Sequence, residues 1–263
     1  MKIAICMSGQ LRQWEMAKEN QKWFWETSGA KQIDYFIHTW DYSGDREGVS
    51  QPYIMRDVSR EEFDKVVDWY KPKGCMFDDR KQDFFFTNDH WSSLFYSMAH
   101  SMMLKRQYEI DNDFEYDLVI KTRPDVVFDP IYHFSWELLE NNILYATQGG
   151  IMETEFHMFN TNDMVFYGNS YTMDLVMQMY FYRQQMLDQR DIIKDKLFTG
   201  SIGPGVLMQE YFRDYGITTQ SIQPNRSTFI ETLVKLGCPQ DLNLMDHNDF
   251  HKMEKYFRDW YKK

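Results

Sequence analysis

One stretch of the chain, residues 116–129, constrains the fold more than any other. Residues 118–120 read Leu-Val-Ile, a run of large apolar side chains. A strand that is buried on both faces of a parallel sheet has this composition, because neither face meets water. The composition then changes at residues 121–125 to Lys-Thr-Arg-Pro-Asp, before a second short apolar run. We therefore expect charged groups at the carboxyl end of a buried strand.

Charged side chains at the end of a buried strand are costly unless they meet a ligand, a metal or one another. In open α/β sheets, this edge is where ligands bind. Two interpretations of the stretch stay open. In one, Arg123 forms a strand-ending salt bridge with Asp125 or Asp129. In the other, Arg123 and Asp125 belong to a binding site.

Strands and helices alternate along the first part of the chain. Apolar runs predict strands at 3–7, 33–37 and 74–77. Helical spacing of apolar residues predicts a helix from Trp14 to Ser28 and another that begins at a capping box formed by Ser59 and Glu62. Residues 42–52 are expected to form a loop. The order β-α-β-α-β is typical of a doubly wound parallel sheet.

The later part of the chain continues without a recognisable linker. Further strands are expected at 143–146, 163–167 and 217–222, and further helices at 91–110, 171–190, 206–214 and from residue 250 onward. At 263 residues with 43% hydrophobic content, the chain is long enough for one large α/β domain. One domain over residues 1–263 is the simplest interpretation.

Charge and cysteine content narrow the function classes. A net charge of −11 without a basic block argues against a nucleic-acid partner. Three widely spaced cysteines, Cys6, Cys75 and Cys238, predict neither a disulfide framework nor a cysteine-based metal site. The apolar start of the chain is too short for a signal peptide, and no run reaches the length of a transmembrane helix. We expect a cytoplasmic protein without a transmembrane segment.

Two polar clusters follow the first two predicted strands. Residues 8–12 read Ser-Gly-Gln-Leu-Arg, and short side chains with a glycine would let backbone N–H groups approach a phosphate, with Arg12 as a cation. The segment matches neither the dinucleotide fingerprint nor the P-loop, and an ordinary strand-to-helix turn is the alternative. In the second cluster, Trp40 would stack on a base while His38 and Asp41 bond its ribose. A buried His with Trp in the core is the alternative there.

Three segments together resemble a known family. Residues 8–12, residues 36–41 (Phe-Ile-His-Thr-Trp-Asp) and residues 116–125 (Tyr-Asp-Leu-Val-Ile-Lys-Thr-Arg-Pro-Asp) resemble GT-A-fold nucleotide-sugar glycosyltransferases of phages, large viruses and bacterial surface-polysaccharide clusters. The resemblance covers the first 130 residues well and the rest more loosely. It implies an α/β fold with a Rossmann-like, mostly parallel sheet flanked by helices, which binds a nucleoside diphosphate sugar at its carboxyl edge. It also allows a virus-encoded protein that acts in a host cell.

The resemblance also implies roles for particular residues. Residues 1–130 would bind the nucleotide sugar, and residues 131–263, with a C-terminal helix, would bind a glycan, lipid or protein acceptor. The expected donor-binding residues are Ser8, Gly9, Gln10, Arg12, His38, Trp40, Asp41, Arg123 and Asp125. Asp163 and Glu210 match positions of catalytic carboxylates, one of which would act as general base. A turn residue and a solvated helix residue, respectively, are the alternatives.

A metal site is implied at Asp125. In the family's Asp-x-Asp motif, two carboxylates hold a divalent metal against the diphosphate. Here Arg123 stands at the first position and Asp125 at the second. We expect Asp125 to bind Mn²⁺ or Mg²⁺, which prefer hard oxygen ligands. Arg123 would either neutralise the diphosphate or orient Asp125.

Two other functions stay open beside glycosyl transfer to a hydroxyl acceptor. A nucleotidyltransferase on a similar sheet would need a glycine-rich phosphate loop or a tight pair of carboxylates. A non-catalytic module that binds nucleotide sugars or carbohydrates would keep the strand-end clusters and tolerate the loss of Asp163 and Glu210.

Overall fold

The computed structural model describes residues 1–45, 54–79, 90–128, 139–151, 159–182, 208, 211–221 and 230–232. The first part of the chain forms β1 (Lys2–Ser8), α1 (Trp14–Glu26), β2 (Gln32–Trp40), β3 (Tyr42–Asp45), β4 (Ile54–Asp57), α2 (Arg60–Tyr70) and β5 (Gly74–Asp78). The second part forms α3 (His90–Asp111), β6 (Leu118–Thr122), β7 (Val126–Phe128), β8 (Ile143–Ile151), β9 (Phe159–Gly168), α4 (Ser170–Met177), a 3₁₀ helix (Gln178–Tyr182), β10 (Thr218–Ser221) and β11 (Ile230–Thr232).

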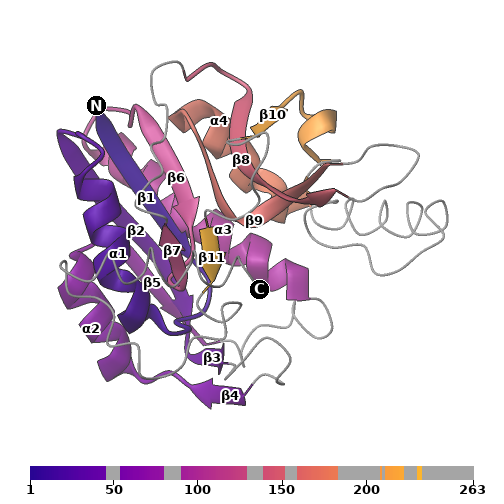
Figure 1. Ribbon diagram of the computed structural model, residues 1–263. Coiled ribbons are helices and arrows are strands. Elements are labelled where there is room, and N and C mark those ends of the chain that lie inside the picture. The colour runs from indigo at the N-terminus through magenta and orange to yellow at the C-terminus, as the bar shows by residue number, and fades with distance from the viewer. Residues whose placement is uncertain are drawn as a thin grey trace, which may run out of the picture.

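Seven of these strands make one central sheet, in the order β10-β8-β9-β6-β1-β2-β5 (Figure 1). β1 lies between β2 and β6 and runs parallel to both, and β5 runs parallel to β2. β9 is antiparallel to both of its neighbours, β6 and β8. The fold class predicted from sequence is confirmed: a mostly parallel α/β sheet flanked by helices, in an arrangement consistent with a GT-A-like Rossmann fold.

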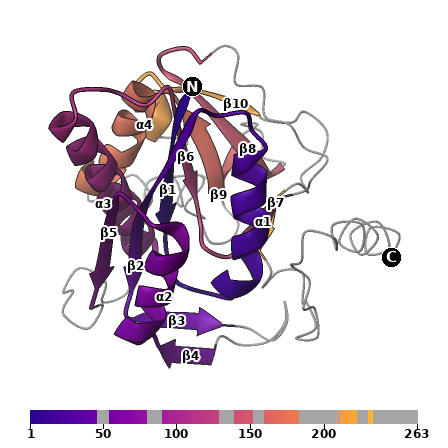
Figure 2. The ribbon, with the colours of Figure 1, turned by 90° about the vertical axis from the view of Figure 1, so that its left-hand side faces the viewer.

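Helices cover both faces of the sheet because its central strands are apolar on both sides. On β1, Ile3 and Ile5 pack with residues of α1 and β7, whereas Ala4 and Cys6 pack with residues of α3 and α4. Figure 2 shows α1 and α2 on one side of the sheet and α3 and α4 on the other. The period-two alternation of a strand thus serves two separate cores.

The structure corrects two expectations about the first part of the chain and adds the direction of β9. Tyr42–Asp45 is not a loop: it forms β3, which pairs antiparallel with β4. His38 and Trp40 lie inside β2 and not after it, because the strand continues alongside β5. The sequence pattern predicts a strand at residues 163–167 without a direction, and this segment runs against its neighbours as part of β9.

The second part of the chain agrees with the sequence in places. α4 begins where expected but ends at Met177 and continues as a 3₁₀ helix. Glu210 and the predicted C-terminal helix lie outside the described residues. Both halves of the chain contribute strands to the same sheet, while their division into donor and acceptor halves stays a prediction. Among the described helices, none is both long enough and apolar enough to cross a membrane.

Candidate functional site

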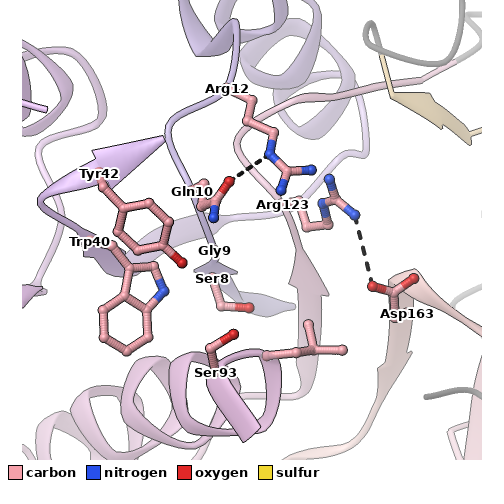
Figure 3. Close-up of a pocket in the computed structure, with 10 residues that line it drawn as sticks. Ser8, Gly9, Gln10, Arg12, Trp40, Tyr42, Ser93, Arg123 and Asp163 are labelled. Atoms are coloured by element: carbon pink, nitrogen blue, oxygen red, sulfur yellow. Dashed lines mark hydrogen bonds and ion pairs between the residues drawn. The ribbon is translucent and has the colours of Figure 1, made fainter. Parts of the chain in front are cut away.

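A pocket lies at the carboxyl edge of the parallel strands β2, β1 and β6 (Figure 3). Its volume is about 220 Å³. The residues that line it are Ser8, Gly9, Gln10, Arg12, Trp40, Tyr42, Ser93, Leu94, Arg123 and Asp163. Six of these ten come from the loops and strand ends at residues 8–12, Trp40 and Arg123, as the parallel topology requires. The three segments singled out in the sequence therefore meet in one place.

The floor of the pocket is formed where β1 ends. Ser8 is fully buried, and its Oγ has no hydrogen-bond partner among the described residues. Gly9 has φ of +120°, a backbone conformation that side chains disfavour. Its N–H donates to the carbonyl of His38 at 3.2 Å and is therefore not directed at a ligand. The Ser8 hydroxyl, buried at the pocket and unpaired, is the polar group here that a ligand would satisfy.

Gln10 and Arg12 form a bonded pair above this floor. Arg12 Nε donates to Gln10 Oε1 at 2.7 Å, and the backbone N–H of Gly44 in β3 donates to the same oxygen at 3.0 Å. Two donors on one oxygen fix the orientation of the Gln10 amide. The arrangement also ties the loop after β1 to the β3 strand.

Two aromatic rings form one side of the pocket. Trp40 at the end of β2 and Tyr42 at the start of β3 have ring centroids 6.5 Å apart. Figure 3 shows both rings on the side of the pocket opposite Arg123 and Asp163. Tyr42 was not predicted as a site residue, because its segment has the composition of a loop. Aromatic faces of this kind suit stacking on a base or a sugar ring.

His38 does not line the pocket but packs against Trp40, one of the two aromatic rings that do. It is fully buried, with Nδ1 2.8 Å from Ser97 Oγ and Nε2 3.2 Å from Asp78 Oδ2. Burial lowers the pKa of His38, and the hydrogen bond with His38 lowers the pKa of Asp78. A neutral His38 imidazole that donates to an ionised Asp78 carboxylate accounts for the lowered pKa of both groups. The His38 ring also makes an edge contact with Trp40, with centroids 4.9 Å apart.

Arg123 and Asp125 form a two-pronged ion pair in the turn between β6 and β7. Arg123 Nε donates to Asp125 Oδ1 at 3.0 Å, and Arg123 Nη2 donates to Asp125 Oδ2 at 2.8 Å. The Asp125 side chain is 1% exposed and the Arg123 side chain 19% exposed. The salt bridge considered from the sequence is therefore present. It holds a guanidinium group at the pocket, where Arg123 is a lining residue and Asp125 is not.

Gln21 holds this turn in place, a role that the sequence did not reveal. It is fully buried in α1, and its Nε2 lies 3.0 Å from the carbonyl oxygen of Arg123, 3.2 Å from that of Pro124 and 2.7 Å from that of Val126. The hydroxyl of Tyr70 donates to Gln21 Oε1 at 3.3 Å. One amide side chain thus organises the backbone that positions Arg123.

Asp163 faces Arg123 from the antiparallel strand β9. Its Oδ2 lies 3.8 Å from Arg123 Nη1, and its side chain is 28% exposed (Figure 3). The side-chain nitrogen of Lys121, which is fully buried in β6, donates to the backbone carbonyl of Asp163. Burial lowers the pKa of Lys121 to about 7. The only carboxylate among the pocket-lining residues therefore lies beside the guanidinium group of Arg123.

The described residues do not fit a divalent ion held by Asp125. Both of its carboxylate oxygens accept hydrogen bonds from Arg123, and the side chain is buried away from the pocket. An ion at Asp125 would have to displace a guanidinium group from a buried, bidentate contact. The pocket instead presents the guanidinium groups of Arg12 and Arg123, which suit an anionic ligand.

The predicted donor residues thus fall into two groups. Ser8, Gly9, Gln10, Arg12, Trp40 and Arg123 line the pocket together with Asp163. His38, Asp41 and Asp125 do not line it, although His38 and Asp125 contact residues that do. The backbone N–H of Asp41 donates to the carbonyl of Asp78 at 2.9 Å, and the Asp41 carbonyl accepts from the N–H of Val58 at 2.7 Å. Glu210 lies outside the described residues.

Comparison with known proteins gives little guidance on function. No protein-family model matches the chain, and no curated protein matches it. Among solved structures, the chain is similar to the glycosyltransferase GlyE of Streptococcus pneumoniae TIGR4, with 12% identity and a TM-score of 0.38 over 85% of this chain and 46% of that one. The apo form of the same glycosyltransferase gives 13% identity and a TM-score of 0.36 over 83% of this chain and 44% of that one. This chain spans less than half of their length.

Proposed function

We propose that this protein is a GT-A-like glycosyltransferase that transfers a sugar from a nucleoside diphosphate sugar to a hydroxyl group of a glycan, lipid or protein. One observation carries the proposal. Aromatic rings, two guanidinium groups and a carboxylate converge on one pocket at the carboxyl edge of three parallel strands. A nucleoside diphosphate sugar contains a base that can stack on aromatic rings, an anionic diphosphate that suits guanidinium groups, and a sugar.

The two sides of the pocket suggest how the donor lies in it. Trp40 and Tyr42 offer a stacking surface for the base. Arg12 and Arg123 offer guanidinium donors for phosphate oxygens, which match such oxygens in charge and geometry. Asp163 is then left beside the sugar. At about 220 Å³ the pocket is smaller than the roughly 300–1,000 Å³ typical of small-molecule sites, so it would enclose part of the donor.

Asp163 is the described residue that is best placed to act as a base. In an inverting reaction, the acceptor oxygen attacks the anomeric carbon while the bond from that carbon to the diphosphate breaks. The acceptor proton passes to a carboxylate, and the leaving diphosphate takes the bonding electrons. Asp163 would accept the proton, and Arg123 would stabilise the developing negative charge. A catalytic role for Glu210 stays a prediction.

A thermal-shift experiment on the full chain tests donor binding. Nucleoside diphosphates would be added with Mn²⁺, with Mg²⁺ and with a chelator. A ligand in large excess over its Kd raises the melting temperature, because it binds only the folded state. We expect a shift that persists in the chelator, since guanidinium groups face the diphosphate. A shift that requires the ion would restore a metal to the site, and no shift with any nucleotide would refute the proposal.

A further inference from the structure

The side chain of Gln10 is fixed with a defined polarity inside the pocket. Its Oε1 already accepts from Arg12 Nε at 2.7 Å and from the Gly44 N–H at 3.0 Å. Rotating the amide by half a turn would place its NH₂ group against both of these donors. The side chain therefore holds one orientation, in which the oxygen is used and the two N–H groups bond no other residue in the described part of the chain, which leaves them to a ligand.

The amide lies between the aromatic residues and the guanidinium group of Arg12. Gly44, which bonds the amide oxygen, belongs to β3, the strand that also carries Tyr42. Figure 3 shows the Gln10 amide between the Tyr42 ring and the Arg12 side chain, with its nitrogen turned away from Arg12. The same pocket therefore combines a stacking surface with a hydrogen-bond donor that cannot become an acceptor.

From this geometry we infer that Gln10 selects the base of the donor, and that it favours a base with a carbonyl group on the edge remote from the ribose. The inference rests on the proposed function. Stacking is tolerant of base identity, because every base has an aromatic face. Selection must come from hydrogen bonds to the edge of the base.

The base class follows from the polarity of that edge. If the diphosphate lies at Arg123, the far end of the nucleotide is the exocyclic group at position 4 of a pyrimidine or position 6 of a purine. Uracil and guanine carry a carbonyl acceptor there, whereas cytosine and adenine carry an amino donor. An amide that presents only N–H groups can donate to the carbonyl of uracil or guanine. It cannot bond the amino group of cytosine or adenine, because both groups are donors. A site left with an unpaired polar group rejects the wrong base.

Equilibrium binding of UDP and CDP to the full chain tests the inference, because their bases differ only along this edge. Calorimetry at fixed ionic strength should give tighter binding of UDP, by about tenfold in Kd for a single hydrogen bond. The same order is expected for GDP over ADP. Equal Kd values for UDP and CDP would overturn the inference and leave the proposed function intact. Failure of all four nucleotides to bind would overturn both.

The variant Gln10→Glu provides a sharper test than removal of the side chain. A carboxylate keeps an acceptor for Arg12 and Gly44, so the loop retains its tie to β3, but it has no N–H to offer. It accepts from the amino group of cytosine. We expect the preference to reverse in favour of CDP. An unchanged preference for UDP would overturn the assignment to Gln10.

The variant Arg123→Lys serves as the matched control. It alters the contact expected for the diphosphate, which all four nucleotides share. Its Kd values should rise by a similar factor for UDP and CDP, with their ratio preserved. A changed ratio would show that Arg123 and not Gln10 senses the base.

Discussion

The ion pair between Arg123 and Asp125 redefines both residues. In the sequence, Asp125 is the candidate metal ligand and Arg123 the departure from a familiar motif. In the structure, the buried carboxylate of Asp125 holds the guanidinium group in a fixed orientation, with contacts of 2.8 and 3.0 Å. Arg123 is then the residue that reaches the pocket. Asp125 acts through it.

Replacement of Asp125 by Asn should therefore affect stability as well as binding. It removes the charge of the carboxylate that holds a largely buried guanidinium group in a bidentate contact, and leaves that group only the longer 3.8 Å contact with Asp163 among the contacts described above. Loss of one member of a buried pair costs about 3–5 kcal/mol. We expect a lower free energy of unfolding in urea and weaker binding of nucleoside diphosphates, to the same degree with and without Mn²⁺.

Asp64→Asn is the control for that variant. Asp64 forms a solvent-exposed ion pair with Arg60 at 3.0 Å, and such pairs contribute about 0–1 kcal/mol. If Asp125→Asn unfolds like the wild type and loses only the response to Mn²⁺, Asp125 is a metal ligand after all.

The lowered pKa of Lys121 should make the free energy of unfolding depend on pH. Its pKa is about 7 in the folded protein, lowered by burial from the 10.5 of a lysine in the unfolded chain. Between these values the unfolded state binds more protons, so the free energy of unfolding rises with pH. From pH 7 to 8.5 the gain should be roughly 1.5 kcal/mol, measured by urea unfolding. The upper limit of pH 8.5 is chosen to limit ionisation of the thiols, whose ordinary pKa is 9.0. Burial raises the pKa of Cys6 above that value.

Lys121→Met isolates this contribution from those of other titrating groups. Methionine fills a similar volume and carries no charge. Its unfolding free energy should change less between pH 7 and 8.5 than that of the wild type. The same pH dependence in both proteins would show that Lys121 is protonated in the folded state.

Helix α1 positions the turn that carries Arg123. Gln21→Met should remove the amide donor from three backbone carbonyls, of which that of Arg123 still accepts from the Val126 N–H at 3.4 Å. A buried polar group that is left without a partner costs about 1–3 kcal/mol. We expect both a lower free energy of unfolding and weaker binding of nucleoside diphosphates, because the turn is less well held. Urea unfolding and calorimetry measure the two effects.

Asn20→Leu separates the two effects. Asn20 is the neighbouring buried residue of α1 and exchanges two hydrogen bonds with the backbone of Phe128, at 2.7 and 2.9 Å. This variant should be destabilised while its nucleotide affinity stays close to that of the wild type. If both variants lose affinity equally, the loss reflects general loosening of β7.

The elements that could be predicted from sequence are those whose own residues specify them. β1 and β6 are apolar on both faces, and α2 begins at Ser59, whose side chain accepts from the N–H of Glu62. β3 could not be predicted, because its four residues have no apolar alternation and depend on pairing with β4. Gln21 resembled any residue of a helix, since its partners are backbone carbonyls about 100 positions away.

The parallel sheet brings residues that are far apart in the chain to one pocket. The rule that ligands bind at the carboxyl edge was enough to predict that residues 8–12, Trp40 and Arg123 would meet. It could not tell which of the two charged residues, Arg123 or Asp125, lines the pocket. Composition gives the charges of Arg123 and Asp125, while the direction of each side chain depends on the turn between β6 and β7.

The same topology brings Asp163 to the pocket. Because β9 is antiparallel and pairs with β6, residues early in β9 lie beside the carboxyl end of β6. Asp163 consequently faces Arg123 across the pocket. If it is the base, Asp163→Asn should keep nucleotide affinity within a few-fold and lower turnover by about 10²–10⁴.

Release of nucleoside diphosphate from nucleotide sugars, with water or a sugar as acceptor, tests the proposed transfer most directly. The full-length wild type, Asp163→Asn and Arg123→Lys would be compared on UDP- and GDP-sugars at equal saturation. The wild type should release the nucleoside diphosphate. Asp163→Asn should bind the donor but release no nucleoside diphosphate from it, and Arg123→Lys should bind the donor more weakly. A wild type that binds these donors but never releases the diphosphate, or an Asp163→Asn variant with wild-type turnover, would contradict the proposal.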